Sequence, residues 1–345
     1  MKKILIAGGG TGGHIFPAIA IAEELKNLNF EPVLVGSRWG IEGNIFPKYP
    51  FKYYLTHQMG FVGKSFIRKI FSIINFLIAI FEVLVIIFKE KPSAVVGTGG
   101  YASFLPVFFL SLMGKPSLIT EIDSIPGFVT KFLSRFVREV HVAFPTVKYY
   151  LPCRKIRHSG FPIRRSILSS EGETERGSIF ILGGSQGSLK LNLIAKDLPK
   201  YLPKKFRIIW QKGRFSEKIP EIKDERVEVY EFIDDMGKFL RRAELIVARA
   251  GALTIGEIAV LGKPSILIPF PYSARGHQLH NALYYKQLGA CEIILEKNLT
   301  APYLAQKIID MMSSPEKLRR MSHSAKKFGK ISTKIIAERI KCFVT

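Results

Sequence analysis

The stretch AGGGTGGHIFPAIAIAEEL, from Ala7 to Leu25, sets the architecture of the first part of the chain. It follows a short apolar run, KILI, and leads into a helix-like pattern. A strand that ends in a Gly-rich turn and opens a helix directs unpaired backbone N–H groups, and the positive end of the helix dipole, at one point. The turn therefore predicts an anion-binding site.

Two other interpretations of this turn stay open. Gly8, Gly10 and Gly13 satisfy G-x-G-x-x-G, the dinucleotide fingerprint. That fingerprint also needs an acidic residue about 20 residues further on to hold a ribose. The second strand ends instead near Arg38, which suits at best a 2′-phosphate, and a dinucleotide turn has no use for His14. An NADP-dependent oxidoreductase is the weaker alternative, and a tight turn beside a structural histidine is the other.

Length and cysteine usage bound the organisation of the chain. With 345 residues it is long for one domain, and 47% hydrophobic residues suffice for two cores. Cys153, Cys291 and Cys342 are widely spaced and form no C-x-x-C pair. Since no signal peptide is recognisable, this pattern favours a reducing cytoplasm and argues against a disulfide framework or a zinc site.

The net charge of +23 at neutral pH predicts an anionic partner. Nucleic acid, a phosphorylated substrate and an acidic membrane would each fit this charge. No groove-reading motif accompanies it, so a nucleic-acid-binding protein is the less favoured interpretation.

The segment from Ile70 to Phe88, IFSIINFLIAIFEVLVIIF, is near the roughly 20 residues of a bilayer span. Its polar side chains nevertheless gather on one narrow stripe of a helix with a very wide apolar face. A spanning helix would also separate the preceding residues from PSAVVGTGG, at 92–100, which is predicted to be the next strand of the same sheet. We expect a helix packed on the sheet with apolar surface to spare; a wholly buried helix is the alternative. The stripe comprises Ser65, Arg68, Ser72, Asn75, Ala79, Glu82 and Lys89.

Strands and helices alternate along the chain, which is typical of a doubly wound parallel sheet. The alternation starts with KILIAG and restarts at SIFILGGSQG, after a basic loop and the polar linker SSEGETERG. The sequence therefore predicts an α/β protein of two Rossmann-like domains. We place the first over 1–160, completed by the C-terminal helix at about 328–345, and the second over 161–327.

The second domain repeats the opening pattern twice. GGSQGS, at 183–188, and ARAGALTIGEIAVLG, at 248–262, each follow a strand and open a helix. Two such helix starts can hold a diphosphate without a metal. The chain has no D-x-D pair for a divalent ion, and the adjacent Asp234 and Asp235 are interpreted as a helix cap. We expect neither a metal nor a cofactor.

Two facing Rossmann-like domains with Gly-rich helix starts describe the glycosyltransferase B architecture. Several segments, in order and spacing over nearly the whole chain, resemble the MurG family of bacterial glycosyltransferases. These segments are GGTGGHIFPA at 9–18, GTGGYASFLP at 97–106, GFPIR at 160–164, GGSQG at 183–187, FIDDM at 232–236, ARAGALTIGEIA at 248–259 and IPFPYSARGHQLHNA at 268–282.

The resemblance implies an inverting hexosyltransferase of peptidoglycan synthesis. Such an enzyme moves N-acetylglucosamine from UDP-N-acetylglucosamine to the 4-hydroxyl of the muramyl sugar of lipid I, which gives lipid II. Because lipid I carries a polyprenyl tail, the implied partners also include an anionic membrane surface at the cytoplasmic face of the inner membrane. A related transferase that uses another nucleotide sugar and lipid is the nearest alternative.

The resemblance also implies the donor-binding residues. Arg164 and Ile233 would line the uracil pocket, Glu257 would hold the ribose hydroxyls, and Gln278 would read the sugar hydroxyls. The donor-binding set is Thr11, Gly12, Gly13, Asp123, Arg164, Ser185, Ile233, Ala252, Leu253, Thr254, Ile255, Gly256, Glu257 and Gln278.

In the first domain the resemblance implies that the opening glycine turn faces the acceptor. His14 then lies where it could take the proton from the attacking hydroxyl, and an imidazole, which ordinarily titrates at about pH 6.5, suits that task. A purely structural or anion-binding His14 is the alternative. The acceptor-binding residues are Gly10, Thr11, His14 and Tyr101, and the catalytic candidates are His14, Asp123 and Glu121.

One departure from the family pattern affects the base. The chain has TEID at 120–123 where the family usually has HEQN, so Asp123 replaces an asparagine expected near the sugar. A carboxylate only accepts hydrogen bonds, and Asp123 could therefore share or take over the role of base.

A membrane-docking surface is expected at the start of the long apolar helix. Aromatic and aliphatic side chains would insert, while lysines and arginines would meet anionic headgroups. The apolar members are Phe61, Phe66, Ile67, Ile70, Phe71 and Ile74, and the basic ones are Lys64, Arg68, Lys69, Lys131, Arg135 and Arg138.

Overall fold

The structure of the chain, a computed structural model, consists of two compact units. Unit 1 comprises Met1–Arg164 and Ile331–Thr345, and unit 2 comprises Arg165–Lys330. For 66–70 only the backbone is described. The described residues are 1–60, 66–151, 155–184, 187–213 and 222–345.

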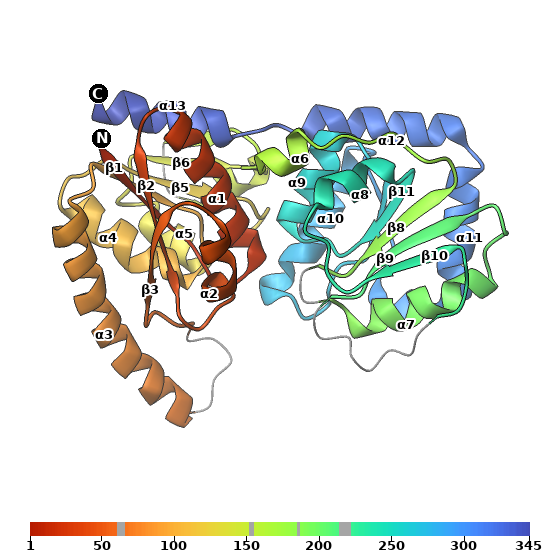
Figure 1. The fold of residues 1–345 in the computed structure, drawn as a ribbon, viewed down its shortest axis with the longest axis horizontal. Helices are drawn as coiled ribbons and strands as arrows, with labels where there is room; N and C mark the ends of the chain where they lie inside the picture. Colours follow the sequence, from red (N-terminus) through yellow and green to blue (C-terminus); the bar gives the residue numbers. More distant parts are fainter. Residues whose placement is uncertain (61–65, 152–154, 185–186, 214–221) are drawn as a thin grey trace. The chain divides into compact units, whose positions relative to one another are not determined.

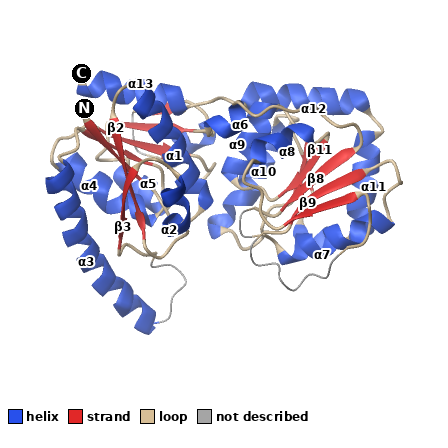
Figure 2. Ribbon diagram, viewed as in Figure 1, coloured by secondary structure: helices blue, strands red, loops and turns tan. Residues whose placement is uncertain are grey.

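Each unit contains a parallel β-sheet with helices packed on it (Figures 1 and 2). The predicted α/β class with two Rossmann-like domains is therefore confirmed. The sequence placed the divisions after residue 160 and after residue 327, whereas the structure divides the chain after Arg164 and after Lys330.

The sheet of unit 1 has, within the described residues, seven parallel strands in the order β3-β2-β1-β4-β5-β6-β7. The chain moves outward from β1 to β3, returns, and then moves outward the other way from β4 to β7. The order therefore reverses between β1 and β4, and ligands of such sheets bind beyond the carboxyl ends of the strands at this switch point. The strands are β1 (Lys3–Ala7), β2 (Glu31–Ser37), β3 (Lys52–Thr56), β4 (Ala94–Gly97), β5 (Ser117–Glu121), β6 (Glu139–Val142) and β7 (Ile156–His158).

Helix α1 (Gly12–Asn27) lies between the sheet of unit 1 and the C-terminal helix α13 (Thr333–Val344). It is apolar almost all round because both of these neighbours bury it: Ile19 packs in one cluster with Ile4 of β1 and Ile336 of α13. Further helices of this unit are α2 (Glu42–Ile45), α4 (Phe104–Leu112) and α5 (Phe128–Leu133).

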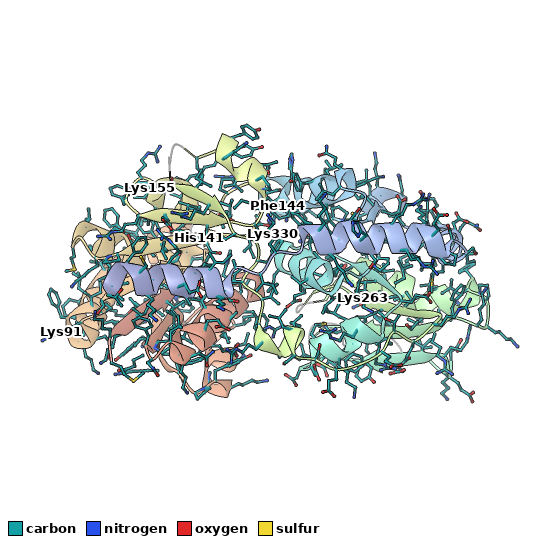
Figure 3. All side chains as sticks on the ribbon, turned by 90° about the horizontal axis from the view of Figure 1, so that it is seen from above. Lys91, His141, Phe144, Lys155, Lys263 and Lys330 are labelled. Atoms are coloured by element: carbon teal, nitrogen blue, oxygen red, sulfur yellow. The ribbon has the colours of Figure 1, made fainter. Side chains whose placement is uncertain are left out.

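The C-terminal helix is also fixed to the sheet by charge. Arg339 donates through Nε to Glu139 of β6 at 3.0 Å, and Glu139 also contacts His141 on the same strand, which is labelled in Figure 3. Burial lowers the pKa of His141 to about 4, so this imidazole is neutral in the folded protein near pH 7.

The long helix α3 (Phe66–Glu90) packs against α4 and β3, and the middle of its polar stripe faces inward. Ser72, Asn75 and Ala79 are buried, whereas Phe81 and Leu77 are 71% and 60% exposed. The predicted helix with spare apolar surface is confirmed, and the wholly buried alternative is wrong. The exposed apolar residues of α3 are Phe71, Ile73, Ile74, Leu77, Ile78, Phe81, Val85 and Phe88.

Strands β3 and β4, which precede and follow α3 in the chain, belong to the same sheet. Strand β4, which follows the helix, pairs with β1 in the register Ile4↔Ala94. Among the described residues, one stretch, Phe71–Glu90, is long and apolar enough to cross a bilayer by length and composition, with a mean hydropathy of 2.7; a third of it is buried. At its end Glu90 binds Lys3 of β1 at 2.8 Å and Lys52 of β3 at 2.7 Å, which anchors the helix to the sheet.

Unit 2 has, within its described part, six parallel strands in the order β10-β9-β8-β11-β12-β13, with a switch point between β8 and β11. The strands are β8 (Ser178–Leu182), β9 (Arg207–Gln211), β10 (Val227–Tyr230), β11 (Leu245–Ala248), β12 (Ser265–Leu267) and β13 (Glu292–Ile293). The helices are α6 (Arg165–Leu168), α7 (Leu189–Asp197), α8 (Met236–Arg242), α9 (Ala252–Leu261), α10 (His277–Gln287), α11 (Ala301–Met312) and α12 (Pro315–Phe328).

Lys263, which is labelled in Figure 3, lies on the side of unit 2 away from its switch point. Its ammonium group donates to Thr174 Oγ1 at 2.8 Å and to the carbonyl of Ala243 at 2.9 Å. Burial lowers the pKa of Lys263 to about 8. This lysine therefore satisfies backbone and side-chain acceptors at the amino ends of the strands.

Candidate active site

In unit 1 the candidate residues follow the two strands of the switch point. The glycine turn and His14 come directly after β1, and Thr98 to Tyr101 come directly after β4. The two loops are in contact, because Thr98 donates its amide to the carbonyl of Ala7 at 2.8 Å.

Thr98 holds His14 at two points. The backbone carbonyl of Thr98 lies 3.0 Å from His14 Nδ1, and the Thr98 hydroxyl donates to the backbone carbonyl of His14 at 2.8 Å. A carbonyl oxygen only accepts, so Nδ1 carries the proton of the neutral ring. The lone pair is then on Nε2, which is the atom that can take up a proton.

The glycines of this region make room for these side chains. A Cβ at Gly8 would lie 1.8 Å from the Thr98 hydroxyl, and one at Gly99 would lie 2.7 Å from His14 Nδ1. Gly100 has φ +73° and approaches the carbonyl of Gly9, so a side chain there would meet backbone. The glycines that predicted an anion-binding site therefore also leave the space that the His14 imidazole and the Thr98 side chain occupy.

The start of α1 nevertheless keeps open donors. Thr11 is the N-cap residue, and no side chain of the described residues caps this helix. Within the described structure the amides of Thr11, Gly12 and Gly13 have no acceptor, as expected for the first turn of a helix. The amide of Gly10, by contrast, donates to the carboxylate of Glu42 at 2.7 Å. An anion at this turn would therefore meet the Thr11–Gly13 amides.

Tyr101 packs on the glycine turn. A Cβ at Gly10, which has φ +94°, would lie 3.0 Å from the Tyr101 ring. Burial raises the pKa of the Tyr101 phenol above its usual range, and a hydrogen bond with Ser37 opposes this shift. Tyr101 is therefore neutral at pH 7 and adjoins the turn from which α1 starts.

Glu121 and Asp123 lie at the end of β5, the strand next to β4. Glu121 is buried and accepts the amide of Asp123 at 3.1 Å and that of Gly127 at 3.1 Å through its two oxygens. Burial raises the pKa of Glu121, and the neighbouring Asp123 carboxylate raises it further. Both Glu121 oxygens thus order the loop that carries Asp123.

Arg164, predicted to line the uracil pocket, is the last residue of the first segment of unit 1. Its guanidinium group lies 3.8 Å from the centre of the Phe16 ring in α1. This cation–π contact fixes Arg164 on the helix that also carries His14.

In unit 2 the helix starts at the switch point differ from each other. Helix α7 is capped by Ser188, whose hydroxyl accepts the amide of Leu191. Helix α9 starts after Gly251, and no described side chain caps it. The amides of its first turn, at Ala252, Leu253 and Thr254, have no acceptor in the described structure. Of these two helix starts, the start of α9 is therefore the one with open amides in the described structure.

Arg249 connects the two loops of this switch point, and sequence analysis missed it. It donates through Nη2 to the Ser188 hydroxyl at 2.6 Å and through Nη1 to the carbonyl of Ile268 at 3.2 Å, and it pairs with Glu296. It is 7% exposed. Arg249 lies two residues before the α9 N-cap, so a buried cation adjoins the predicted diphosphate site. The motif A-R-A-G was the available signal.

The remaining donor candidates lie on α9, before α8 and in α10. Glu257, Ile255 and Gly256 are buried in α9. Ile233 donates its amide to Gln211 at 3.1 Å, so a base edge would meet other atoms of this residue. Gln278 accepts the amide of Phe270 at 2.9 Å, which leaves its NH₂ group as a donor for a ligand.

Two further predictions have different outcomes. Asp235 caps α8 by accepting the amide of Lys238 at 3.2 Å, so its interpretation as a cap is confirmed. Ser185 lies outside the described residues, as do the side chains of Lys64, Arg68 and Lys69 in the predicted docking surface. Phe61 and the side chains of Phe66, Ile67 and Ile70 of that surface are likewise outside.

The chain is similar to known proteins over nearly its whole length. Residues 4–142 match the glycosyltransferase family 28 N-terminal domain, and residues 178–336 match the glycosyltransferase family 28 C-terminal domain. A UDP-N-acetylglucosamine--N-acetylmuramyl-(pentapeptide) pyrophosphoryl-undecaprenol N-acetylglucosamine transferase of Myxococcus xanthus (strain DK1622) is 39% identical, covering 96% of this chain and 90% of the relative. The protein of the same name from Thermodesulfovibrio yellowstonii is 38% identical, covering 95% and 94%.

Solved structures agree with these relatives. The crystal structure of Acinetobacter baumannii MurG has a TM-score of 0.77 and 27% sequence identity, covering 99% of this chain and 100% of that one. The glycotransferase of kitacinnamycin has a TM-score of 0.74 at 13% identity, covering 100% and 99%, and supports the fold alone. Together with the motifs at both switch points, these similarities confirm the resemblance seen in the sequence: the chain belongs to the MurG family of the family 28 glycosyltransferases.

Proposed function

We propose that this chain transfers N-acetylglucosamine from UDP-N-acetylglucosamine to the 4-hydroxyl of the muramyl sugar of lipid I, which gives lipid II for peptidoglycan synthesis. The observation that carries this proposal is the pair of open helix starts, one in each unit, with His14 on the first turn of α1. The names of the relatives that match over nearly the whole chain support the substrates.

The donor is held in unit 2. The amides at the start of α9 receive the diphosphate, and the dipole of α9 adds about 0.3–1 kcal/mol to each such charge interaction at an exposed site. Glu257 accepts the ribose hydroxyls, and the NH₂ group of Gln278 donates to a sugar hydroxyl. Arg249, fixed by Ser188 and Glu296, adds positive charge close to the same helix start.

The acceptor reacts in unit 1. The Thr11–Gly13 amides hold its pyrophosphate, and His14 Nε2 takes the proton of the 4-hydroxyl as its oxygen attacks the anomeric carbon. One bond forms between that oxygen and the anomeric carbon, the bond from this carbon to the UDP oxygen breaks, and UDP leaves with the electron pair. Attack from the opposite side inverts the configuration. Asp123 is the competing base.

The lipid tail of the acceptor requires unit 1 to meet a bilayer, and a peripheral attachment through α3 fits the structure best. Helix α3 contacts α4 through the rings of Phe76 and Phe104, 6.2 Å apart, and α4 contacts α5 through those of Phe104 and Phe132, 5.4 Å apart. Phe128 of α5 is 67% exposed. Lys131, Arg135 and Arg138 lie on and after α5, where they would meet anionic headgroups.

A transfer assay tests the proposed function. Labelled UDP-N-acetylglucosamine and a lipid I analogue are incubated with the protein, and the lipid product is separated. We expect label in the lipid fraction with the inverted anomeric configuration. Release of free N-acetylglucosamine alone, or transfer with another nucleotide sugar only, would contradict the proposal.

A further inference from the structure

Glu42, the first residue of α2, joins two loops of unit 1. Its side chain is fully buried. One carboxylate oxygen, Oε1, accepts the amide of Gly10 at 2.7 Å and the amide of Ser37 at 3.1 Å. The carboxylate therefore ties the glycine turn after β1 to the end of β2.

Three glycines leave space for this carboxylate: Gly9 after β1, Gly36 near the end of β2 and Gly40 after β2. A Cβ at Gly9 would lie 1.9 Å from Glu42 Oε1, and one at Gly40 would lie 1.9 Å from Oε2. At Gly36 a Cβ would lie 2.8 Å from Glu42 Cγ. None of these three glycines has a positive φ, so the space, rather than the backbone conformation, requires glycine there.

One oxygen of the Glu42 carboxylate carries a cost. This oxygen, Oε2, is buried and has no hydrogen-bond partner in the described structure. A buried acceptor without a partner is unfavourable. The gain must come from what Oε1 holds, which is the turn immediately before α1.

We propose that Glu42 is a positioning residue for the transfer reaction. By fixing the Gly10 amide it sets the path of the turn, and with it the Thr11–Gly13 amides and His14 at the start of α1. It also directs the anion away from Gly10, because that amide is already in use. This inference rests on the proposed function in unit 1.

Two glycine variants separate positioning from general stability. Gly40→Ala displaces the Glu42 carboxylate without changing its chemistry, and we expect kcat to fall on the order of 10²-fold, as for a misplacement of about 1 Å. Gly43→Ala is the matched control, because its Cβ meets only Leu55 Cδ1 at 3.7 Å. Glu42→Gln keeps the shape and loses the charge, and we expect a smaller loss, roughly 10-fold.

Coupling to His14 gives the decisive readout. If Glu42 acts through the turn, Glu42→Gln lowers kcat much less in a His14→Ala background than in the wild type, with UDP affinity unchanged in both. Glu90→Gln changes another buried carboxylate of unit 1, and we expect it to leave kcat unchanged. Additive losses, or an equal loss of kcat in Glu90→Gln, would overturn the inference.

A second measurement keeps this inference separate from the proposed function. The His14 ring signals in an NMR spectrum should shift in Gly40→Ala and stay in place in Gly43→Ala, whether or not the wild type transfers sugar. An inactive wild type with shifted His14 signals would refute the proposed function only. Unshifted signals in folded Gly40→Ala would refute the role of Glu42.

Discussion

Each unit has a switch point of the same kind in its sheet, but the helices that start there differ between the units. In unit 1 the helix after the first strand, α1, has no side-chain cap in the described structure. The buried Glu42 carboxylate binds the turn before this helix, and His14 lies on its first turn. In unit 2 the helix after the first strand, α7, is closed by its Ser188 cap, and α9 is open beside the buried cation Arg249. The difference fits the proposed division of tasks, in which the turn and His14 of unit 1 serve the acceptor and the start of α9 in unit 2 serves the donor diphosphate.

The largest effect should come from the base in unit 1. We expect His14→Ala to lower kcat by roughly 10²–10⁴-fold, because general base catalysis is lost. UDP affinity should stay nearly unchanged, since the proposed UDP site lies in unit 2. Steady-state kinetics and calorimetric titration of UDP measure the two quantities. Asp123→Asn restores the residue usual in the family and serves as the comparison. A large loss in Asp123→Asn with a small one in His14→Ala would assign the base to Asp123.

The complementary effect should come from Glu257 in unit 2. Glu257→Ala removes the proposed acceptor of the ribose hydroxyls, and charge-assisted hydrogen bonds of this kind contribute about 1.5–3 kcal/mol. We expect UDP affinity to fall on the order of 10- to 100-fold by calorimetry. Glu244→Ala, at the opposite end of the strands, is the matched control and should bind UDP like the wild type. Unchanged affinity in the folded Glu257 variant would remove this residue from the site.

Loss of exposed apolar side chains should weaken membrane binding when they lie on α3 of unit 1, but not when they lie on unit 2. Changing Leu77, Phe81 and Phe88 of α3 together to Ser removes side chains that each contribute up to about 1.5–3 kcal/mol when buried. We expect binding to acidic liposomes to weaken by roughly 10-fold or more in a sedimentation assay, and the KM for lipid-linked acceptor to rise. The matched control changes Leu193, Tyr201 and Tyr303 of unit 2, which are also exposed. Equal weakening in both triple variants would show that α3 is not the docking surface.

The smallest effect concerns the anchor of α3. Burial alone would raise the pKa of Glu90, but hydrogen bonds from Lys3, Lys52 and Tyr54 outweigh it and lower the pKa to about 2 from 4.5. A carboxyl group with a lowered folded pKa stabilises the protein above its unfolded pKa, and this stability is lost as the pH falls from 4.5 toward 2. Thermal unfolding of wild type and Glu90→Gln should therefore differ above pH 5 and converge toward pH 2. A difference that persists at pH 2 would contradict the assigned contacts.

The fold was predictable from the sequence because its signals are local. The apolar run before the glycine turn, the restart at 178 and the cap at Asp235 each lie within a few residues of what they determine. The contacts that complete the sites are not local. Thr98 reaches His14 across 84 residues, and Glu42 reaches Gly10 across 32, so no spacing rule reveals them.

The role of Glu42 could not be predicted either, because its contact with the glycine turn is not local. An acidic residue was sought at the end of β2 to hold a ribose, and Glu42 comes five residues later and turns back to the glycine turn instead. The polar stripe of α3 could be predicted from the spacing of its residues. Which face of the helix packs inward could not, because that depends on neighbours such as α4.

The division of labour between the units is tested most directly by single-turnover transfer as a function of UDP-N-acetylglucosamine concentration, for wild type, His14→Ala and Glu257→Ala. We expect His14→Ala to lower the maximal rate at an unchanged half-saturating concentration. Glu257→Ala should raise the half-saturating concentration and largely keep the maximal rate. The reverse pattern, with donor saturation shifted by His14→Ala and the maximal rate lost in Glu257→Ala, would contradict the assignment of acceptor chemistry to unit 1 and donor binding to unit 2.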